Sequence, residues 1–542
     1  MRPFKEQFTL RGVVTGLLGC VIITASSVYV ALKLGMLPWP IFFVVLLALF
    51  VLKAFARVSR RATNINEANV SATIMSAGAM VAGGLAFTIP GIYILMPAAE
   101  VPLATVVLCA LCGVALGCIC TSLVRKHFIE DSKLPYPIGT GAAQTLEAGD
   151  KGGRKALLLF SSVGLAGVFA VVRDALGAVP QMLFDWVKIP GVAFGVYFSP
   201  MAIATGFMIG PLAALVWVLG GLFGNFVLVS GGVAVGLWDL AAALDIRKSL
   251  GIGVMIGCGL GIIFKVVLPR VRQMFAPLFT REKGSAIVPM RWAPFVLAAV
   301  VLVLSFVVGL GLLPSLLLVL LTWVVVTMAA QSTGQAGLNP MEVFGVIVLL
   351  IIALICQTGG IEAFLVTAVA TVACGFVGDL MNDFKAGHLL KSDPKAQFIG
   401  EALGGVVGAV VGALIIAALV AAYGPESFGA GKEFVSAQAD VVASMVGGIP
   451  HLPAFVIGIV AGTALYLVGA PVITLGLGIY LPFYLSLTIA VGAAVRFVIG
   501  LVAPQWSKGE DGIIIASGLL GGESIAGVIL ALIVIASGLT AL

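Results

Sequence analysis

The sequence predicts an all-α polytopic membrane protein, and three observations carry this prediction. The 542 residues are 61% hydrophobic and 10% charged, whereas soluble globular chains carry about 25% charged residues. Apolar runs of about 20 residues, the length that crosses a bilayer as a helix, recur along the whole chain. The 68 glycines and 25 prolines are spread among these runs, as in membrane helices, where small residues allow close packing. A soluble globular protein is therefore excluded.

The apolar runs predict about 14–16 transmembrane helices, some of them broken. The predicted spans lie near 10–33, 37–56, 67–90, 101–124, 155–178, 190–210, 211–230, 248–268, 294–311, 313–330, 341–358, 362–382, 397–423, 452–469, 472–501 and 513–541. The stretches 134–148 and 434–449 are too short and too polar to cross, so we expect re-entrant or interfacial segments there. Glycine or proline is expected to interrupt apolar runs at Gly83-Gly84, Pro90, Pro135, Pro137, Pro200, Pro211, Pro471 and Pro482.

Two short patterns indicate that the chain consists of two related halves, residues 1–285 and 286–542. Asn64-x-x-Glu67 recurs as Asn339-x-x-Glu342, and Gly195-Val-Tyr197 recurs as Gly478-Ile-Tyr480. Both recurrences are separated by about half the chain, and halves with an even number of spans would be related by an axis along the membrane normal. The basic segment 265–291 is then the expected linker.

The distribution of Lys and Arg predicts the orientation in the membrane. If the N-terminus is inside and the predicted spans alternate, most of the Lys and Arg residues fall in loops on the cytoplasmic side. The start, MRPFKEQFTLRG, leads into an apolar run without an A-x-A-like cleavage site, so we interpret it as a retained first span rather than a cleaved signal. The sequence therefore predicts a multi-pass protein of the cytoplasmic membrane with both termini cytoplasmic.

Several charged residues lie in or beside apolar runs. A charge at mid-bilayer costs about 2.5–3.5 kcal/mol on insertion scales, so such a residue is a functional candidate by default. The candidates are Glu67, Glu342, Glu362, Asp379, Asp383, Glu401, Arg496 and Glu523. The alternative interpretation is that many of them lie at helix ends in the membrane interface; Glu362, which follows two glycines, fits that description best.

Five stretches of the sequence are similar to one known family. NINEANVSATIMSAGAMVAGGLAFTIP, KLPYPIGTGAA, GDLMNDFKAGHLLKSDPKAQFIGEALGG and GLGIYLPFYLSLTIAVGAAVRFVIG, followed by SGLLGGESIAG, resemble stretches of the oligopeptide transporter (OPT) family, which includes the yellow stripe-like metal-chelate carriers. The resemblance runs through nearly the whole chain. It implies a proton-coupled secondary carrier, a symporter, of small peptides or metal–amino-acid chelates. The short loops resemble those of a prokaryotic member.

Two sets of residues are the candidates for these roles. A carboxyl group removed from water binds a proton more readily, so proton coupling is expected at Glu67, Asp379, Asp383, Glu401 or Glu523. Amide and phenol groups suit a peptide backbone, so we expect substrate contacts from Asn66, Asn69, Tyr480 and Tyr484. Arg496 is expected either to bind the carboxylate of the peptide or to form a structural ion pair.

The polar start of the third span admits two interpretations. Asn64, Asn66, Glu67 and Asn69 could line a water-filled vestibule open to the cytoplasm; Asn66 and Asn69 then share one helix face, and Asn64 and Glu67 form the adjacent pair. Alternatively these residues only begin a helix, with Asn64 or Asn66 as the N-cap and Glu67 favoured by the helix dipole.

Channels and membrane-embedded enzymes are the alternatives to a transporter. No H-E-x-x-H, G-x-S-x-G or P-loop motif occurs, and the acids are scattered singly rather than arranged as in a charged pore. The eight cysteines and three histidines lack metal-site spacing, so no metal or cofactor is expected. The expected partners are the peptide or metal-chelate substrate, protons and membrane lipid, and no nucleic acid. The sequence does not determine the oligomeric state, so a homo-oligomer stays open.

Overall fold

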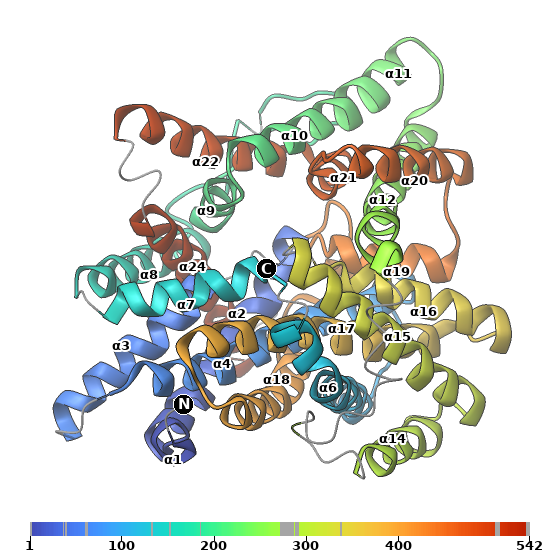
Figure 1. The fold of residues 1–542 in the computed structure, drawn as a ribbon. Coiled ribbons are helices and arrows are strands. Elements are labelled where there is room, and N and C mark those ends of the chain that lie inside the picture. Colours follow the sequence, from blue (N-terminus) through green and yellow to red (C-terminus); the bar gives the residue numbers. More distant parts are fainter. Residues whose placement is uncertain are drawn as a thin grey trace. The chain divides into compact units, whose positions relative to one another are not determined.

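A computed structural model describes residues 3–35, 41–59, 63–131, 134–150, 153–184, 186–270, 292–336, 339–503 and 510–537, together with residues 37 and 287. Most of the expected linker 265–291, including the predicted boundary at 285, lies outside the described residues. In the described part, eleven helices are long and apolar enough to cross a membrane, and four further apolar helices are shorter. Figure 1 shows a ribbon made almost entirely of helices, which confirms the predicted all-α polytopic class.

The helices group into two compact units, which we call unit 1 and unit 2. Unit 1 comprises residues 1–28, 40–156 and 266–419, and unit 2 comprises residues 29–39, 157–265 and 420–542. Each unit therefore draws on both the N-terminal and the C-terminal part of the chain. The internal repeat between 1–285 and 286–542 concerns sequence relationship rather than this spatial grouping, so it stays a prediction.

All regular secondary structure in the described residues of unit 1 is helical. Its elements are α1 (Phe4–Gln7), most of α2 (Leu10–Leu34), α3 (Ile41–Ser59), α4 (Ile65–Ala86), α5 (Pro90–Leu95), α6 (Leu103–Lys126), η1 (His127–Asp131), α7 (Pro137–Asp150), α14 (Ala293–Leu302), η6 (Val303–Val307), α15 (Leu312–Ala336), α16 (Met341–Cys356), α17 (Gly360–Leu390) and most of α18 (Pro394–Tyr423).

Unit 2 contains helices of varied length and one strand pair. Its elements are α8 (Arg154–Asp174), β1 (Met182–Leu183), β2 (Val196–Tyr197), α9 (Pro200–Ile209), α10 (Pro211–Gly221), η2 (Leu222–Gly231), α11 (Gly232–Ala234), α12 (Leu240–Ile262), η3 (Ile263–Val267), η7 (Pro425–Ser427), α19 (Ala437–Gly447), α20 (Leu452–Leu467), α21 (Val472–Tyr480), α22 (Phe483–Val502) and α24 (Glu510–Ser537). The antiparallel pair joins Met182 to Tyr197. In both units a few residues at helix ends belong to the neighbouring unit.

Helix α17 forms the core of unit 1. It packs against α4, α6, α7, α15 and α16, and every residue from Ala363 to Phe384 is buried. The segment is long, apolar and free of proline, so nothing in it interrupts the helix. Because neighbours cover this part of α17 on all sides, polar side chains there must find partners inside the protein.

The predicted breaks are confirmed at most of the prolines. Pro200 and Pro211 are the first residues of α9 and α10, and Pro482 separates α21 from α22. Pro fits a first helical turn because the N–H that it lacks would have no partner there. The predicted single span 472–501 is consequently two helices.

Two further local predictions are wrong. No break occurs at Gly83-Gly84, because α4 continues to Ala86. A Cβ atom on Gly84 would lie 2.7 Å from the Cα of Val372, so this glycine allows α4 and α17 to approach closely instead. The span expected near 190–210 is absent as well: residues 196–197 form β2, and the helix α9 begins only at Pro200.

Candidate functional site

Three buried carboxyl groups of unit 1 lie together, and we call them the acid cluster. Asp379 and Asp383 are one turn apart on α17, so they share a helix face, and Glu401 comes from α18. One ligand oxygen from each lies within 4.8 Å of the others. Their exposed fractions are 1%, 7% and 0%. Each of these acids was an individual candidate in the sequence, and the structure shows that the three lie together.

The acid cluster has few hydrogen-bond donors. Ser76 of α4 donates to Oδ2 of Asp383 at 3.0 Å. Both carboxylate oxygens of Glu401 and Oδ2 of Asp379 have no hydrogen-bond partner among the described residues, and no ion pair reaches the cluster there. Buried carboxylates without donors or cations are costly, so the cluster requires bound protons or a bound cation.

Glycines bring α18 close enough to α4 to complete the acid cluster. A Cβ atom on Gly404 would lie 2.2 Å from the carbonyl oxygen of Ile74, and one on Gly408 would lie 2.6 Å from the Cα of Gly78. Glu401 lies one turn before Gly404, so the same close contact holds its side chain beside α4 and α17.

One face of α4 carries polar side chains toward the acid cluster. Asn66, Asn69, Thr73 and Ser76 recur at three- and four-residue steps, which places them on one side of the helix, and all four are buried. Asn69 donates to the hydroxyl of Ser392 at 3.2 Å, whereas Oδ1 of Asn66 and the hydroxyl of Thr73 have no partner in the described part of the chain. The shared face of Asn66 and Asn69 agrees with the expected spacing.

Glu67 lies on a different face and is fully engaged. It accepts hydrogen bonds from Nε and Nη2 of Arg11, each at 2.7 Å, and one from the hydroxyl of Thr9. Asn64 is the N-cap of α4, since its Oδ1 accepts the N–H of Glu67 at 2.8 Å. The capping interpretation of this stretch is therefore present in the structure, next to a bidentate ion pair.

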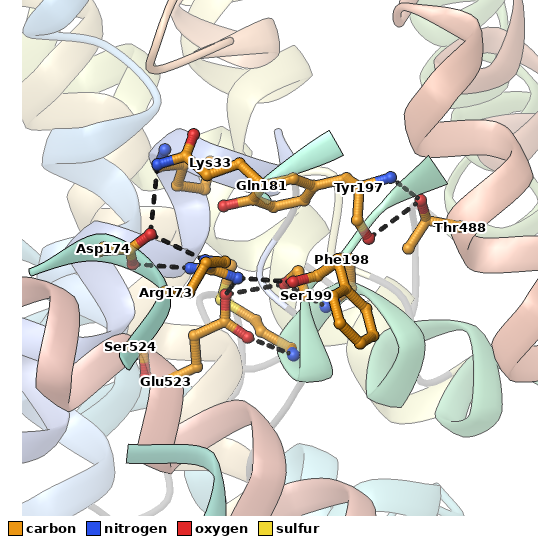
Figure 2. A network of polar contacts seen from close by, with 12 residues as sticks. Lys33, Arg173, Asp174, Gln181, Tyr197, Phe198, Ser199, Thr488, Glu523 and Ser524 are labelled. Atoms are coloured by element: carbon orange, nitrogen blue, oxygen red, sulfur yellow. Dashed lines mark hydrogen bonds and ion pairs between the residues drawn. The ribbon is translucent and has the colours of Figure 1, made fainter. Parts of the chain in front are cut away.

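In unit 2, Glu523 belongs to a second charged network, which Figure 2 shows from close by. Arg173 donates to Asp174 through Nε and Nη2, each at 2.7 Å, and to Glu523 through Nη1 at 2.8 Å. Glu523 also accepts the hydroxyl of Ser199 at 2.8 Å and the N–H of Met201 at 2.7 Å, in the first turn of α9. These partners are those of an ionised carboxylate.

Lys33, in the last turn of α2, lies in the same unit among aromatic rings. Its Nζ is 5.9 Å from the ring centroid of Tyr29, 6.0 Å from that of Tyr197 and 5.2 Å from that of Phe434. The same Nζ forms an ion pair with Glu433. Burial raises the pKa of Tyr197 to about 12, so its phenol stays protonated at neutral pH.

Comparisons with known proteins identify the family of this chain. The family model described as "OPT oligopeptide transporter protein" matches residues 7–263 and 272–534. The chain belongs to the OPT family. A Haemophilus influenzae protein named "Putative oligopeptide transporter" is 25% identical, over 94% of this chain and 93% of that protein. OPT proteins are membrane transporters, so this chain is a multi-pass transporter and not an enzyme.

Two further sequence candidates of the OPT chain, Tyr480 and Arg496, have partners inside unit 2. The hydroxyl of Tyr480 donates to Asp440, which also pairs with Lys248 at 2.9 Å. Arg496 donates through Nη1 to the carbonyl oxygens of Phe207 and Met208, at 2.9 Å and 3.0 Å, at the end of α9. No carboxylate pairs with Arg496 among the described residues.

Sequence reasoning missed several polar residues of the transporter. Thr73 and Ser76 were recognisable, because they continue the face of Asn66 and Asn69 at helical spacing. Lys33, Arg173 and Asp440 lie in or beside apolar segments, and the general cost of burying a charge was the only signal that could have drawn attention to them.

Proposed function

We propose that this OPT chain is a secondary active transporter that uses protons to drive small peptides or peptide-like metal chelates across the cytoplasmic membrane. The name of the Haemophilus relative supports the peptide substrate. Counted over the spans expected from the sequence, the excess of Lys and Arg in alternate loops supports cytoplasmic termini. The acid cluster of unit 1 supports coupling to an ion, and it is the observation on which this proposal chiefly rests.

Charge repulsion explains why the acid cluster suits coupling. Two unit charges 4 Å apart interact by about 4 kcal/mol at an effective dielectric constant of 20, and the cluster holds three carboxyl groups within 4.8 Å. The fully ionised cluster is therefore unfavourable unless it takes up positive charge. A proton that enters relieves the repulsion between α17 and α18, and a proton that leaves restores it, so proton binding is linked to the packing of these helices.

The five acids proposed for coupling then divide into two groups. Asp379, Asp383 and Glu401 form the cluster and are the proposed proton carriers. Glu67 and Glu523 each pair with an arginine and accept further hydrogen bonds, so a proton would have to displace a cation from them. We assign these two residues to holding the helices in place.

The polar face of α4 is a suitable place for substrate contact in unit 1. The unpartnered Oδ1 of Asn66 can accept an N–H group of a peptide or of a water molecule. Asn69 keeps its donor on Ser392. We propose that Asn66 contributes an amide contact to the transported peptide and that Asn69 holds the segment after α17 in position.

Uptake into proteoliposomes tests this function. Liposomes that contain the purified protein are offered a panel of small peptides, with and without Fe(III) chelates, under an imposed pH gradient. Asp379→Asn, Asp383→Asn and Glu401→Gln are each compared with Glu362→Gln, which changes an exposed acid of α17, the helix that carries both aspartates. We expect at least one cluster variant to lose gradient-driven accumulation while it retains counterflow exchange. Accumulation that survives in all three variants would rule out coupling through the cluster.

The same oxygens also make a second coupling ion chemically reasonable. Carboxylate and hydroxyl oxygens are the ligands of hard cations, and the cluster is the one group of three such acidic, cysteine or histidine residues found in the described part of the chain. A parallel uptake experiment with an imposed Na⁺ gradient at constant pH separates the two ions. Accumulation driven by Na⁺ alone would replace the proton in this proposal.

A further inference from the structure

Lys33 is a largely buried cation in unit 2 for which the coupling proposal gives no role. Its side chain is 10% exposed, whereas that of its partner Glu433 is 42% exposed. Burial of an ammonium group is expensive unless it is paired. The ammonium group of Lys33 is therefore largely removed from water, whereas the carboxylate that pairs with it remains partly in contact with water.

The rings around Lys33 come from segments far apart in the sequence. Tyr29 belongs to α2, Tyr197 to β2 and Phe434 to the segment 424–436. Tyr29 and Phe434 meet edge to face at 5.9 Å, and Tyr197 and Tyr484 at 6.4 Å between centroids. A cation within about 6 Å of a ring centroid is attracted by the ring, and more strongly when water is excluded. The rings therefore fix Lys33 and keep it charged.

Hydroxyl groups around Lys33 are available for a ligand. The rings of Tyr29 and Tyr197 lie against its ammonium group, Tyr484 packs on Tyr197 at 6.4 Å, and Tyr423 packs on Phe434 at 5.1 Å between ring centroids. In the described part of the chain none of these four hydroxyls has a protein hydrogen-bond partner. Phenols donate one hydrogen bond each, so a cation and several O–H donors converge on the same region. That combination recognises an anion with several acceptor oxygens, such as a carboxylate.

The other acids of the region form ion pairs with a different cation. Asp174 and Glu523 both pair with Arg173, and Figure 2 shows the guanidinium of Arg173 between them. Among the described residues, Lys33 pairs with Glu433 alone. A carboxylate therefore already occupies the position that the cation and the phenols define.

Glu433 can leave that position at small cost. It lies in the segment 424–436, where the rings of Phe428 and Phe434 stack at 5.3 Å and the N–H of Phe434 bonds to the carbonyl oxygen of Ser427 at 2.9 Å. This anchor holds the segment while the neighbouring Lys432 and Glu433 stay exposed. A displaced Glu433 returns to water, but an unpaired Lys33 does not, so exchange for another carboxylate is favoured over simple opening.

We propose that Lys33 binds a carboxylate of the transported peptide or chelate, with the tyrosine hydroxyls as additional donors, and that Glu433 occupies this position when substrate is absent. The inference rests on the proposed peptide substrate and names the chemical group that is recognised. It makes Glu433 an internal competitor, so removal of its charge increases substrate affinity, whereas removal of the charge of Lys33 decreases it.

Ligand binding to the purified full-length protein tests the inference without requiring transport. The probes are trialanine and trialanine amide, which differ only in the C-terminal carboxylate, and the measurement is the ligand-induced shift in melting temperature across a concentration series. We expect trialanine to bind the wild type more tightly than its amide does. Lys33→Gln should weaken trialanine about tenfold or more and remove this preference. Glu433→Gln should tighten trialanine several-fold and leave the amide unchanged.

Matched variants control for indirect effects. Glu426→Gln and Lys432→Gln change exposed charges of the same segment and should leave both affinities unaltered. Lys33→Arg keeps the cation and should retain the preference if Lys33→Gln fails to fold. Equal binding of the two probes to the wild type, a preference that survives Lys33→Gln, or weaker binding of trialanine to Glu433→Gln would each overturn the inference. If the wild-type protein shows this binding pattern but no proton-driven uptake, the proposed coupling is refuted and the inference about Lys33 stands.

Discussion

Arg11 donates two parallel hydrogen bonds of 2.7 Å each to the carboxylate of Glu67. This ion pair joins the start of α2 to the first turn of α4. The side chain of Glu67 is 1% exposed and that of Arg11 is 22% exposed. Removal of the arginine would leave a buried carboxylate, whereas removal of the carboxylate leaves a cation that can still reach water. The two partners of this ion pair are therefore unequal.

We expect Arg11→Ala to destabilise the protein by about 3 kcal/mol and Glu67→Gln by less. Apparent melting temperatures of the purified variants measure this difference. Transport per folded molecule should be retained in Glu67→Gln, because its carboxylate serves the ion pair. A well-folded Glu67→Gln protein that exchanges substrate but no longer accumulates it would return Glu67 to the group of proton carriers.

Asn64 caps α4, and its contribution to stability can be isolated. Loss of an N-cap side chain typically costs about 1 kcal/mol, so Asn64→Ala should lower the melting temperature modestly and leave uptake per folded molecule unchanged. Asn64→Asp keeps the capping oxygen but loses the amide donor to the carbonyl oxygen of Glu6 at 2.8 Å, so it should recover only part of this loss. Reduced uptake in a folded Asn64→Ala protein would favour the vestibule interpretation of this stretch.

The sequence predicted features that depend on local spacing and failed where distant segments meet. The shared face of Asn66 and Asn69 and the one-turn separation of Asp379 and Asp383 follow from helical periodicity. The contact of Glu401 with those aspartates could not be predicted, because it depends on glycine-mediated packing between α18 and α4. The environment of Lys33 combines α2, β2 and the segment 424–436, and no periodicity within one segment encodes such a meeting.

Two buried glutamates should respond in opposite directions to loss of charge. Both oxygens of Glu401 are unpartnered within the described residues, so Glu401→Gln should leave the melting temperature at neutral pH unchanged or raise it, because a like charge is removed. Glu523 accepts three hydrogen bonds, so Glu523→Gln should cost about 2–3 kcal/mol. Equal destabilisation by both substitutions would contradict the distinction between the acid cluster and the charged network of Arg173, Asp174 and Glu523.

The glycines of α18 allow a matched test of how the acid cluster is assembled. Gly404→Ala would place a methyl group 2.2 Å from the carbonyl oxygen of Ile74, whereas at Gly412 the nearest atom is the Cδ1 of Leu85 at 3.3 Å. We expect Gly404→Ala to cost about 1–3 kcal/mol and to impair gradient-driven accumulation, with Gly412→Ala close to the wild type. Normal accumulation by a folded Gly404→Ala protein would show that coupling tolerates separation of α4 from α18.

Arg496 was expected either to bind the peptide carboxylate or to have a structural role, and its observed partners favour the second. It donates to the carbonyl oxygens of Phe207 and Met208 at the end of α9, directly before the break at Gly210 and Pro211. The last carbonyls of a helix lack intrahelical partners, and a cation there satisfies them and the helix dipole. Gly210 has a positive φ of 85°, so the chain leaves the helical path there. No further turn of α9 follows to donate N–H groups to the carbonyl oxygens of Phe207 and Met208.

We therefore expect Arg496→Lys to weaken trialanine and its amide by the same factor, through the geometry of α9, because lysine keeps the charge and loses the planar guanidinium. Lys33→Gln, in contrast, should weaken the free carboxylate selectively, so the two residues can be compared in one binding experiment. If Arg496→Lys reduces the affinity for trialanine while the amide is unaffected, the carboxylate receptor is Arg496, and the assignment of that role to Lys33 has to be abandoned.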